Sequence, residues 1–374
     1  MAQIKPFKIE VHQSILDDLK IRLEKTNWPN VISGQAYGGP YLEDMKTLVS
    51  KFLQFDWRKE EAKLNELPQF TTEIDGQTIH FIHVKSERHG AIPIMLIHGW
   101  PGSIVEFLDV IKPLTHQNES ERAFDVVIPS LPGFGFSGPT KKPGWNHNQI
   151  ANALIELMDR LGYKKFGVQG GDAGAILGPE MARIAPEKFI GVHVNAATMG
   201  FMPMGPIDDA VSARFTDAEK ERVARMQEFM QTKFGFNLLH SNQPQLVAYA
   251  ISDSPAGLMA WMTQLFSPVG LEAKFFTNFV IYWATGTISS SIRMYYEEAH
   301  SPTAWAPKTN SGVPTGVAVF QDEDIAIRYF AEASNTIVRW KEYPSGGHYA
   351  VMKAGDVWLK DVKEFFDDLA SKTF

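Results

Sequence analysis

The sequence predicts an α/β fold in which a mostly parallel, doubly wound sheet carries an inserted helical segment. The first observation is a series of continuous apolar runs, the kind that strands covered on both faces need, alternating with helical patterns. The second is the stretch FGVQGGDAGAILGPEMARIAP, residues 166–186, which reads as a strand, a sharp glycine-rich turn and a helix. The third is that strand and helix patterns return after residue 313, beyond a long segment with few strand signals.

Composition narrows the class of protein. The 374 residues suffice for one large core with an insertion or for two domains, and 44% of them are hydrophobic, as in ordinary globular proteins. The net charge of −7 is spread without long runs of one sign, so neither nucleic acid nor an anionic membrane is an expected partner. Cysteine is absent, which excludes disulfides, thiolate metal sites and a cysteine nucleophile. The first residues lack the apolar core of a signal peptide and no run is long enough to span a membrane, so we expect a cytoplasmic protein.

Residues 1–90 are predicted to form a helical meander followed by a hairpin. The first helix shows leucines at helical spacing and is expected to end at Trp28-Pro29. A second helical segment, YLEDMKTLVSKFLQFDWRKEEAKLNEL, stops at Pro68. The run QFTTEIDGQTIHFIHVKS then reads as two strands joined at Asp75-Gly76, a dipeptide that suits a tight hairpin turn.

Residues 91–197 are predicted to form the first half of the sheet domain. Two apolar runs, AIPIMLIH and FDVVIP, are predicted strands, and each opens into a glycine-containing loop, HGWPGS after the first and SLPGFGFSGP after the second. An amphipathic helix over 147–162 leads to the strand at 166, and FIGVHVNA is a further strand. This alternation of strands and helices is typical of a doubly wound sheet.

Residues 198–305 are predicted to be a helical lid inserted into the sheet domain. Methionines, aromatic residues and prolines dominate this segment, and DAEKERVARMQEFMQTKF and SPAGLMAWMTQLF have helical patterns. Residues 306–374 then complete the sheet domain. The strand-like segment GVAVFQDED ends in three acidic residues at 322–324, the next strand leads into a loop with His348, and an amphipathic helix closes the chain.

The glycine-rich turn displays the side chain of Asp172. A strand that turns directly into a helix holds its central residue in the open above the sheet edge, and the surrounding glycines permit so tight a turn. Serine at this place would be the nucleophile of an acyl-transfer enzyme, whereas a carboxylate is already anionic and can attack an sp3 carbon directly. The alternative is an ordinary loop in which Asp172 only caps the helix. A phosphate site is disfavoured, because the turn has no lysine and a carboxylate repels phosphate.

The chain order of the candidate residues is informative. Asp172 comes first, an acid at 322–324 second and His348 third, which is the order of nucleophile, acid and histidine in the α/β-hydrolase fold. The segments GGDAG, HGWPGS and GGH resemble those of the epoxide hydrolases. Further segments, over nearly the whole chain, resemble the microsomal-type branch in a soluble form: FDWRKEEAKLNELPQF, IDGQTIHFIH, SLPGFGFS, YWATGTISSSIRMYYEE and PTGVAVF.

The resemblance implies hydrolysis of an epoxide through a covalent intermediate. Asp172 would attack a ring carbon and form an ester, and His348 would activate the water that hydrolyses the ester to a vicinal diol. Glu323 would be the acid that orients His348, although the residues alone leave Asp322, Glu323 and Asp324 open. No metal or organic cofactor is implied, and the expected partners are an apolar epoxide and water.

Other residues would stabilise charge or contact the substrate. By the resemblance, the main-chain N–H groups of Trp100 and Ala173 form the oxyanion hole. Tyr295 occupies the position of one family tyrosine that donates to the epoxide oxygen, and the adjacent Tyr296 is easily mistaken for it. The second family tyrosine falls where this chain has Phe236, which cannot donate. Phe236, Trp100 and Tyr296 are expected to line a mostly apolar substrate pocket.

Two other functions compete with this interpretation. A haloalkane-type dehalogenase uses the same nucleophile and histidine, but such enzymes often place a tryptophan directly after the nucleophile, where this chain has Ala173. A weakly active or binding homologue is the other alternative, and Phe236 is the residue that favours it. The identity of the epoxide and the regioselectivity are not predicted. A homodimer is compatible with a meander that packs on the lid of its own chain or of a neighbour.

Overall fold

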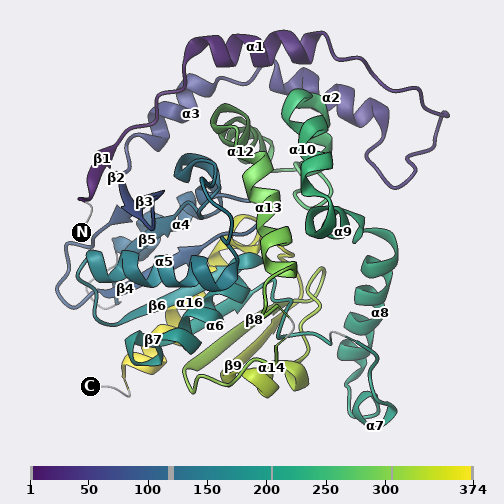
Figure 1. The fold of residues 1–374 in the computed structure, drawn as a ribbon. Helices are drawn as coiled ribbons and strands as arrows, with labels where there is room; N and C mark the ends of the chain where they lie inside the picture. Colours follow the sequence, from purple (N-terminus) through teal and green to yellow (C-terminus); the bar gives the residue numbers. More distant parts are fainter. Residues whose placement is uncertain (1–2, 117–121, 204, 305, 372–374) are drawn as a thin grey trace.

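One sheet runs through the molecule and positions the other elements (Figure 1). Within residues 3–116, 122–203, 205–304 and 306–371, which this computed structural model describes, nine strands pair in the order β1-β2-β3-β5-β4-β6-β7-β8-β9. They are β1 Lys5–Phe7, β2 Gln69–Ile74, β3 Gln77–Val84, β4 Ile92–Ile97, β5 Phe124–Pro129, β6 Phe166–Gly171, β7 Phe189–Asn195, β8 Pro314–Phe320 and β9 Thr336–Tyr343. Pairings among β4 to β9 are parallel, and β1, β2 and β3 extend the sheet antiparallel. The predicted mostly parallel sheet is confirmed.

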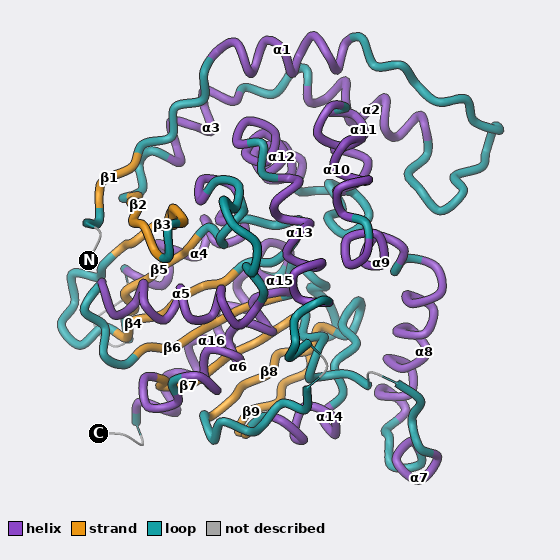
Figure 2. The backbone as a smooth tube through the Cα atoms, in the orientation of Figure 1, coloured by secondary structure: helices purple, strands orange, loops and turns teal. Residues whose placement is uncertain are grey.

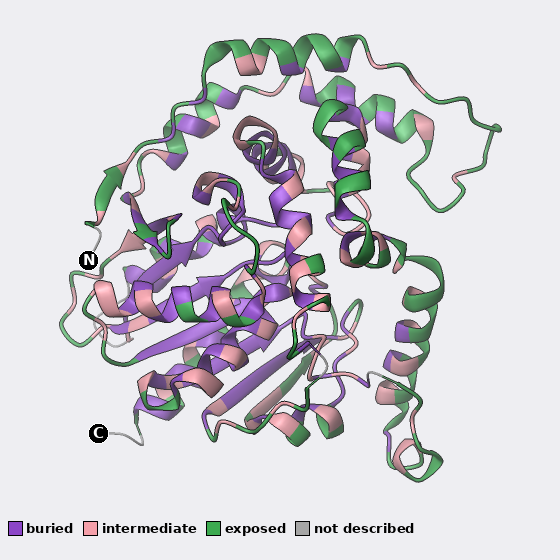
Figure 3. Cartoon of the chain, viewed as in Figure 1, coloured by how far each residue is buried: buried purple, intermediate pink, exposed green. Residues whose placement is uncertain are grey.

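The two faces of the sheet bury two separate apolar clusters, because successive strand residues point to opposite sides. In β4, Ile94 and Leu96 belong to one cluster, and Met95 and Ile97 belong to the other. Helices α4 and α16 cover the first face, and α5 and α6 cover the second. Figure 3 shows the strands between them as almost entirely buried. The helical elements of this part are α4 Leu108–Thr115, α5 His147–Arg160, α6 Ala173–Ile184, α14 Arg328–Ser334, α15 Ala350–Lys353, α16 Gly355–Ala370 and the 3-10 turns η1 Ile104–Phe107, η2 Gly135–Ser137 and η3 Pro186–Lys188.

The N-terminal segment differs in two details from its prediction. The first helix ends at Glu24, before Trp28-Pro29, and the second helical segment breaks in two because Asp56 accepts a hydrogen bond from the N–H of Lys59 and caps a new helix. The predicted hairpin is present, with Asp75-Gly76 at its turn, and its strands join the central sheet. Figure 1 shows these helices arching over the helical segment that lies between β7 and β8. They are α1 Gln13–Glu24, α2 Leu42–Phe52 and α3 Trp57–Leu64.

Only helices and loops lie between β7 and β8 among the described residues of that stretch (Figure 2). Helix α12 packs against η1 and η2, which follow β4 and β5, so this segment covers the carboxyl ends of the parallel strands. That edge is where α/β sheets place their ligands. The helices are α7 Asp209–Ser212, α8 Asp217–Thr232, α9 Gly235–Asn242, α10 Pro244–Asp253, α11 Pro255–Met262, α12 Glu272–Thr285 and α13 Ile288–Ala299.

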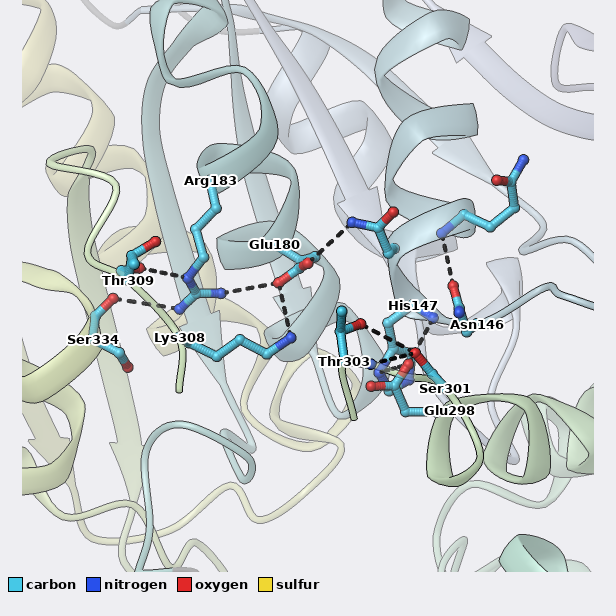
Figure 4. Close-up of polar contacts among 12 residues, drawn as sticks. Asn146, His147, Glu180, Arg183, Glu298, Ser301, Thr303, Lys308, Thr309 and Ser334 are labelled. Atoms are coloured by element: carbon cyan, nitrogen blue, oxygen red, sulfur yellow. Dashed lines mark hydrogen bonds and ion pairs between the residues drawn. The ribbon is translucent and has the colours of Figure 1, made fainter. Parts of the chain in front are cut away.

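Polar contacts join α13, the last helix before β8, to the helices that cover the sheet (Figure 4). Glu298 of α13 accepts a hydrogen bond of 2.9 Å from the N–H of His147 at the start of α5, and it lies 3.3 Å from the Nδ1 atom of that histidine. Nearby, Glu180 of α6 pairs with Arg183 and with Lys308. These contacts fix the return of the chain into β8. No helix among the described residues has the length and apolar character needed to cross a bilayer.

Candidate active site

Asp172 sits at the turn between β6 and α6 with a strained backbone. Its φ of 53° and ψ of −118° are rarely adopted by residues other than glycine, and such strain clusters at functional sites. Glycines are required around it, since a Cβ at Gly170 would collide with the backbone of Gly174 and a Cβ at Gly174 with the carbonyl of Ile97. The Asp172 side chain makes no capping hydrogen bond to α6. The alternative of a simple helix cap is therefore not realised.

The Asp172 carboxylate is held by main-chain donors from two loops. Its Oδ1 atom accepts a 3.0 Å hydrogen bond from the N–H of Trp100, in the loop after β4, and the N–H of Ala173 is a second donor. Burial alone would raise the pKa of Asp172, but the hydrogen bond and charge of His348, together with both N–H groups, hold it below its usual value. Asp172 is thus an anion at neutral pH beside two main-chain N–H groups that can donate hydrogen bonds to a developing oxyanion.

His348 lies opposite Asp172, in the loop after β9. Its Nε2 atom is 3.4 Å from Oδ2 of Asp172. Burial would lower the pKa of His348, yet the hydrogen bond and charge of Asp172 raise it above the usual value, and Asp324 and Glu106 add to this in their ionised forms. A histidine in this place can take a proton from a water that approaches the Asp172 carboxyl group.

The three acids after β8 have different contacts. Asp322 accepts hydrogen bonds from the main chain at 346–347, and Glu323 accepts one of 2.7 Å from the main-chain N–H of His348. Glu323 also pairs with Lys353 at 3.1 Å, and 45% of its side chain is exposed. In the structure Glu323 therefore binds the main chain of His348, whereas the sequence resemblance implies that it orients the imidazole ring of His348.

Asp324 is the buried member of the three. It is 5% exposed, and its Oδ2 atom accepts a 2.7 Å hydrogen bond from the N–H of Phe320. Burial raises its pKa to about 7, although main-chain hydrogen bonds and the charge of His348 oppose the rise. The charge of Asp324 is among the influences that raise the pKa of His348.

Aromatic side chains of α9 and α13 gather over Trp100. Phe236 stacks on the indole, with ring centroids 5.8 Å apart, and Tyr295 meets the indole edge-on at 6.3 Å. Burial and then the charge of Asp172 raise the pKa of Tyr295 well above its ordinary value, so its hydroxyl stays protonated and can donate. The structure thus brings together two of the three predicted pocket residues, Trp100 and Phe236, with the predicted proton donor Tyr295, and His240 joins them.

Tyr296 does not belong to this cluster. Consecutive residues of a helix point about 100° apart, so when Tyr295 faces Trp100 its neighbour must face elsewhere. Tyr296 is 38% exposed and stacks on His300, with ring centroids 3.9 Å apart. This geometry corrects the prediction that Tyr296 lines the substrate pocket, because its ring lies outside the cluster around Trp100.

Comparisons with known proteins identify the family and the fold. Residues 4–107 match the family model described as epoxide hydrolase N terminus, and residues 92–270 match the alpha/beta hydrolase fold. Juvenile hormone epoxide hydrolase 2 of Ctenocephalides felis is 32% identical, over 99% of this chain and 88% of that protein. Epoxide hydrolase 1 of Sus scrofa is also 32% identical, over 97% of this chain and 88% of that protein. This chain belongs to the epoxide hydrolase family.

Solved epoxide hydrolases share its fold. The enzyme of Aspergillus niger superposes with a TM-score of 0.86 at 30% identity, covering 98% of this chain and 97% of that one. The family and the α/β-hydrolase fold predicted from the motifs are confirmed, as is the prediction that the chain is an epoxide hydrolase enzyme. A surface hollow around Ile9 and Arg58, on the N-terminal segment, contains none of the predicted site residues.

Sequence reasoning missed Glu106 of this epoxide hydrolase. Glu106 is 8% exposed, and among the described residues its Oε1 atom has no hydrogen-bond partner. Burial chiefly raises its pKa to about 8, opposed by the charge of His348, so the carboxyl is mostly protonated at neutral pH. The spacing Ser103-x-x-Glu106 before an apolar run is a capping-box pattern that would have drawn attention to it. Within the described part of the chain, no group of three or more acidic or histidine side chains gathers as a metal site.

Proposed function

We propose that this chain converts an apolar epoxide to a vicinal diol through a covalent ester on Asp172. The observation that carries the proposal is the position of the Asp172 carboxylate, which lies between the N–H of Trp100 and the imidazole of His348 and makes no capping bond to its helix. The aromatic surroundings, with Trp100 and Phe236 buried, suit an apolar substrate.

The first step forms the ester. One carboxylate oxygen of Asp172 attacks a ring carbon from behind, and the C–O bond of the epoxide breaks with its electron pair going to the ring oxygen. An alkoxide is a poor leaving group near neutral pH, so this oxygen needs a proton, and the protonated hydroxyl of Tyr295 supplies it. A positioned acid of this kind typically contributes about 10²- to 10⁴-fold to the rate.

The second step hydrolyses the ester. The Nε2 atom of His348 takes a proton from water, and the resulting hydroxide attacks the carboxyl carbon of Asp172. The oxyanion that forms is stabilised by the N–H groups of Trp100 and Ala173. On its collapse the leaving alkoxide takes the proton of the His348 imidazolium and departs as the diol. The carboxylic acid left at Asp172 gives its proton to the tyrosinate of Tyr295, so that the carboxylate and the hydroxyl are both regenerated. One oxyanion donor is typically worth about 3 kcal/mol of the barrier.

The acid that supports His348 is proposed from burial and charge. The resemblance points to Glu323, but its carboxylate binds the main chain of His348 and the ammonium of Lys353 in an exposed position. Asp324 is buried and its charge favours the protonated imidazole. We therefore assign to Asp324 the stabilisation of the imidazolium, and to Glu323 the placement of the loop that carries His348.

The experiment that tests the function is trapping of the ester. The variant His348→Gln, incubated with aryl and alkyl epoxides, should accumulate an adduct of substrate mass on the peptide that contains Asp172. The double variant Asp172→Asn, His348→Gln is the matched control and should give none. Chloroalkanes with the same carbon skeletons separate the two chemistries, since a dehalogenase would form its adduct from them. Adducts from chloroalkanes alone, or a wild type that forms no diol from any epoxide, would refute the proposal.

A further inference from the structure

His240 is buried in the aromatic cluster beside the proposed nucleophile. It lies on α9 one turn after Phe236, and none of its surface is exposed. Its ring meets the indole of Trp100 edge-on with centroids 4.7 Å apart, and it meets the ring of Tyr295 at 5.0 Å. His240 therefore contacts the side chain of Trp100, whose main-chain N–H is the first oxyanion donor, and the side chain of Tyr295, the proposed proton donor to the epoxide oxygen.

The position of the proton on His240 follows from its partner. The indole N–H of Trp261 points at Nε2 of His240, at 2.9 Å. An indole N–H can only donate, so Nε2 must accept and a neutral ring carries its proton on Nδ1. Burial lowers the pKa of His240 to about 3, so the ring is neutral in the physiological range. His240 thus presents an N–H group at Nδ1.

That N–H group has no partner in the part of the chain that the structure describes. Among the described residues, Nδ1 of His240 is a buried polar atom without a hydrogen-bond partner. Buried donors are almost always paired, and an unpaired one calls for an explanation. A ligand oxygen entering the cluster would be such a partner, and the epoxide oxygen must come close to the hydroxyl of Tyr295, whose ring packs on His240.

We propose that the Nδ1–H group of His240 donates a hydrogen bond to the epoxide oxygen while Asp172 attacks, beside the proton donor Tyr295. This inference rests on the proposed function. It gives the oxygen a second donor in a chain where Phe236 stands at the position of the second family tyrosine. The donor comes from the same helix as Phe236, displaced by one turn.

The step balances without any further reactant. Asp172 forms the new C–O bond, the old C–O bond gives its electron pair to the ring oxygen, and the proton of the Tyr295 hydroxyl moves to that oxygen. The tyrosinate regains its proton in the second step, from the carboxylic acid that ester hydrolysis leaves at Asp172. His240 donates a hydrogen bond and keeps its proton, because a neutral imidazole N–H is a very weak acid. Its contribution is confined to ester formation, since ester hydrolysis no longer involves the epoxide oxygen.

The test measures the rate of adduct formation on Asp172 in the His348→Gln background. In His240→Gln the side-chain oxygen can still accept from Trp261, but the donor at Nδ1 is lost, and we expect adduct formation to slow about 10²-fold. In His240→Asn an amide N–H can stand near the Nδ1 position, so the slowing should be smaller. Adding Phe236→Tyr to His240→Gln should restore much of the rate, which a merely structural role would not produce. Leu238→Ala, at an exposed position of the same helix, is the control and should react at the parental rate.

Several outcomes would overturn the proposal. If His240→Gln forms the adduct at the parental rate, the inference fails while the proposed function stands. If His240→Gln and His240→Asn are equally slow and Phe236→Tyr rescues neither, His240 is only a packing residue. The indole N–H of Trp100 is also buried without a partner among the described residues, so Trp100→Phe, which keeps the main-chain donor, is measured in parallel. Slowing in Trp100→Phe alone assigns the donor to Trp100. A parent that forms no adduct refutes the proposed function itself.

Discussion

The Nε2 atom of His348 lies 3.4 Å from the Oδ2 atom of Asp172, and each residue changes the proton affinity of the other. The imidazole helps to hold the pKa of Asp172 below its usual value, and the carboxylate raises the pKa of His348 against the effect of burial. An ester on Asp172 carries no charge, so this support for the imidazolium ends once the ester forms. His348 then becomes a neutral base at the stage when the mechanism needs one.

Asp172→Asn should lower the pKa of His348. Burial is the largest influence on this histidine and lowers its pKa, and asparagine removes the main opposing charge. The measurement is a pH titration of the His348 ring by NMR in both proteins. Asp217→Asn, which changes a side chain that is 96% exposed on α8, is the control and should leave the titration unchanged. A pKa that stays the same or rises in Asp172→Asn would show that the carboxylate does not stabilise the imidazolium.

Asp324→Asn and Glu323→Gln should show which of these two acids supports the imidazole of His348. Asp324 is ionised above about pH 7, and in Asp324→Asn this buried charge that favours the imidazolium is gone, so ester hydrolysis above that pH should slow by about 10²-fold or more. In Glu323→Gln the amide oxygen can still accept from the main-chain N–H of His348, so hydrolysis should fall only a few-fold. Decay of the trapped ester, followed by mass after rapid mixing, gives both rates. The reverse ranking would return the role to Glu323.

The parts of the site predicted from sequence are those that local backbone geometry dictates. Asp172 could be recognised because glycines must surround so tight a turn, and the loop with Trp100 follows from a buried strand that ends in glycine. The family motifs then supplied His348 and Tyr295.

The parts that escaped prediction depend on tertiary burial. Three consecutive acids leave a strand end in different directions, and only the packed structure shows that Asp324 is inside and Glu323 outside. Tyr295 and Tyr296 likewise differ only in their direction from the helix axis. His240 shows nothing unusual in sequence, since its proton position depends on an indole that lies 21 residues away.

Gly99→Ala should impair ester formation without unfolding the protein. A Cβ at residue 99 would collide with the side chain of Asp172, including its Cγ at 2.6 Å, so the carboxylate must move. A displacement of about 1 Å at a reacting group can cost about 10²-fold in rate. Gly355→Ala, where a Cβ meets nothing within 4 Å, is the matched control. Single-turnover adduct formation checks the rate, and thermal unfolding checks the fold. Parental adduct formation in Gly99→Ala would mean that Asp172 is placed less tightly than its contacts imply.

Asp361→Asn should destabilise the protein in a way that fades at low pH. The buried carboxylate accepts hydrogen bonds from Nε2 of His193 at 2.9 Å, Nε of Arg339 at 2.8 Å and the hydroxyl of Tyr343 at 2.8 Å. Burial would raise its pKa, but these partners hold it at about 2, below the unfolded value of about 3.9. The stabilisation is therefore present above about pH 4 and is lost as the pH falls through about 2. Near neutral pH the variant should lose about 3 kcal/mol of unfolding free energy, because Arg339 is left without its buried partner.

Urea unfolding of the wild type and of Asp361→Asn, repeated from neutral pH down to about pH 2, tests this expectation. The difference between the two proteins should be constant at neutral pH and should narrow steadily below about pH 4, since the wild-type carboxyl takes up a proton there and loses its charge as the amide has done. Asp368→Asn is the control, because Asp368 is 69% exposed and lies 3.8 Å from the same Arg339, and exposed pairs contribute about 1 kcal/mol or less. A difference that persists unchanged at the lowest pH would mean that Asp361 stabilises the fold through shape and hydrogen bonding, and not through its charge.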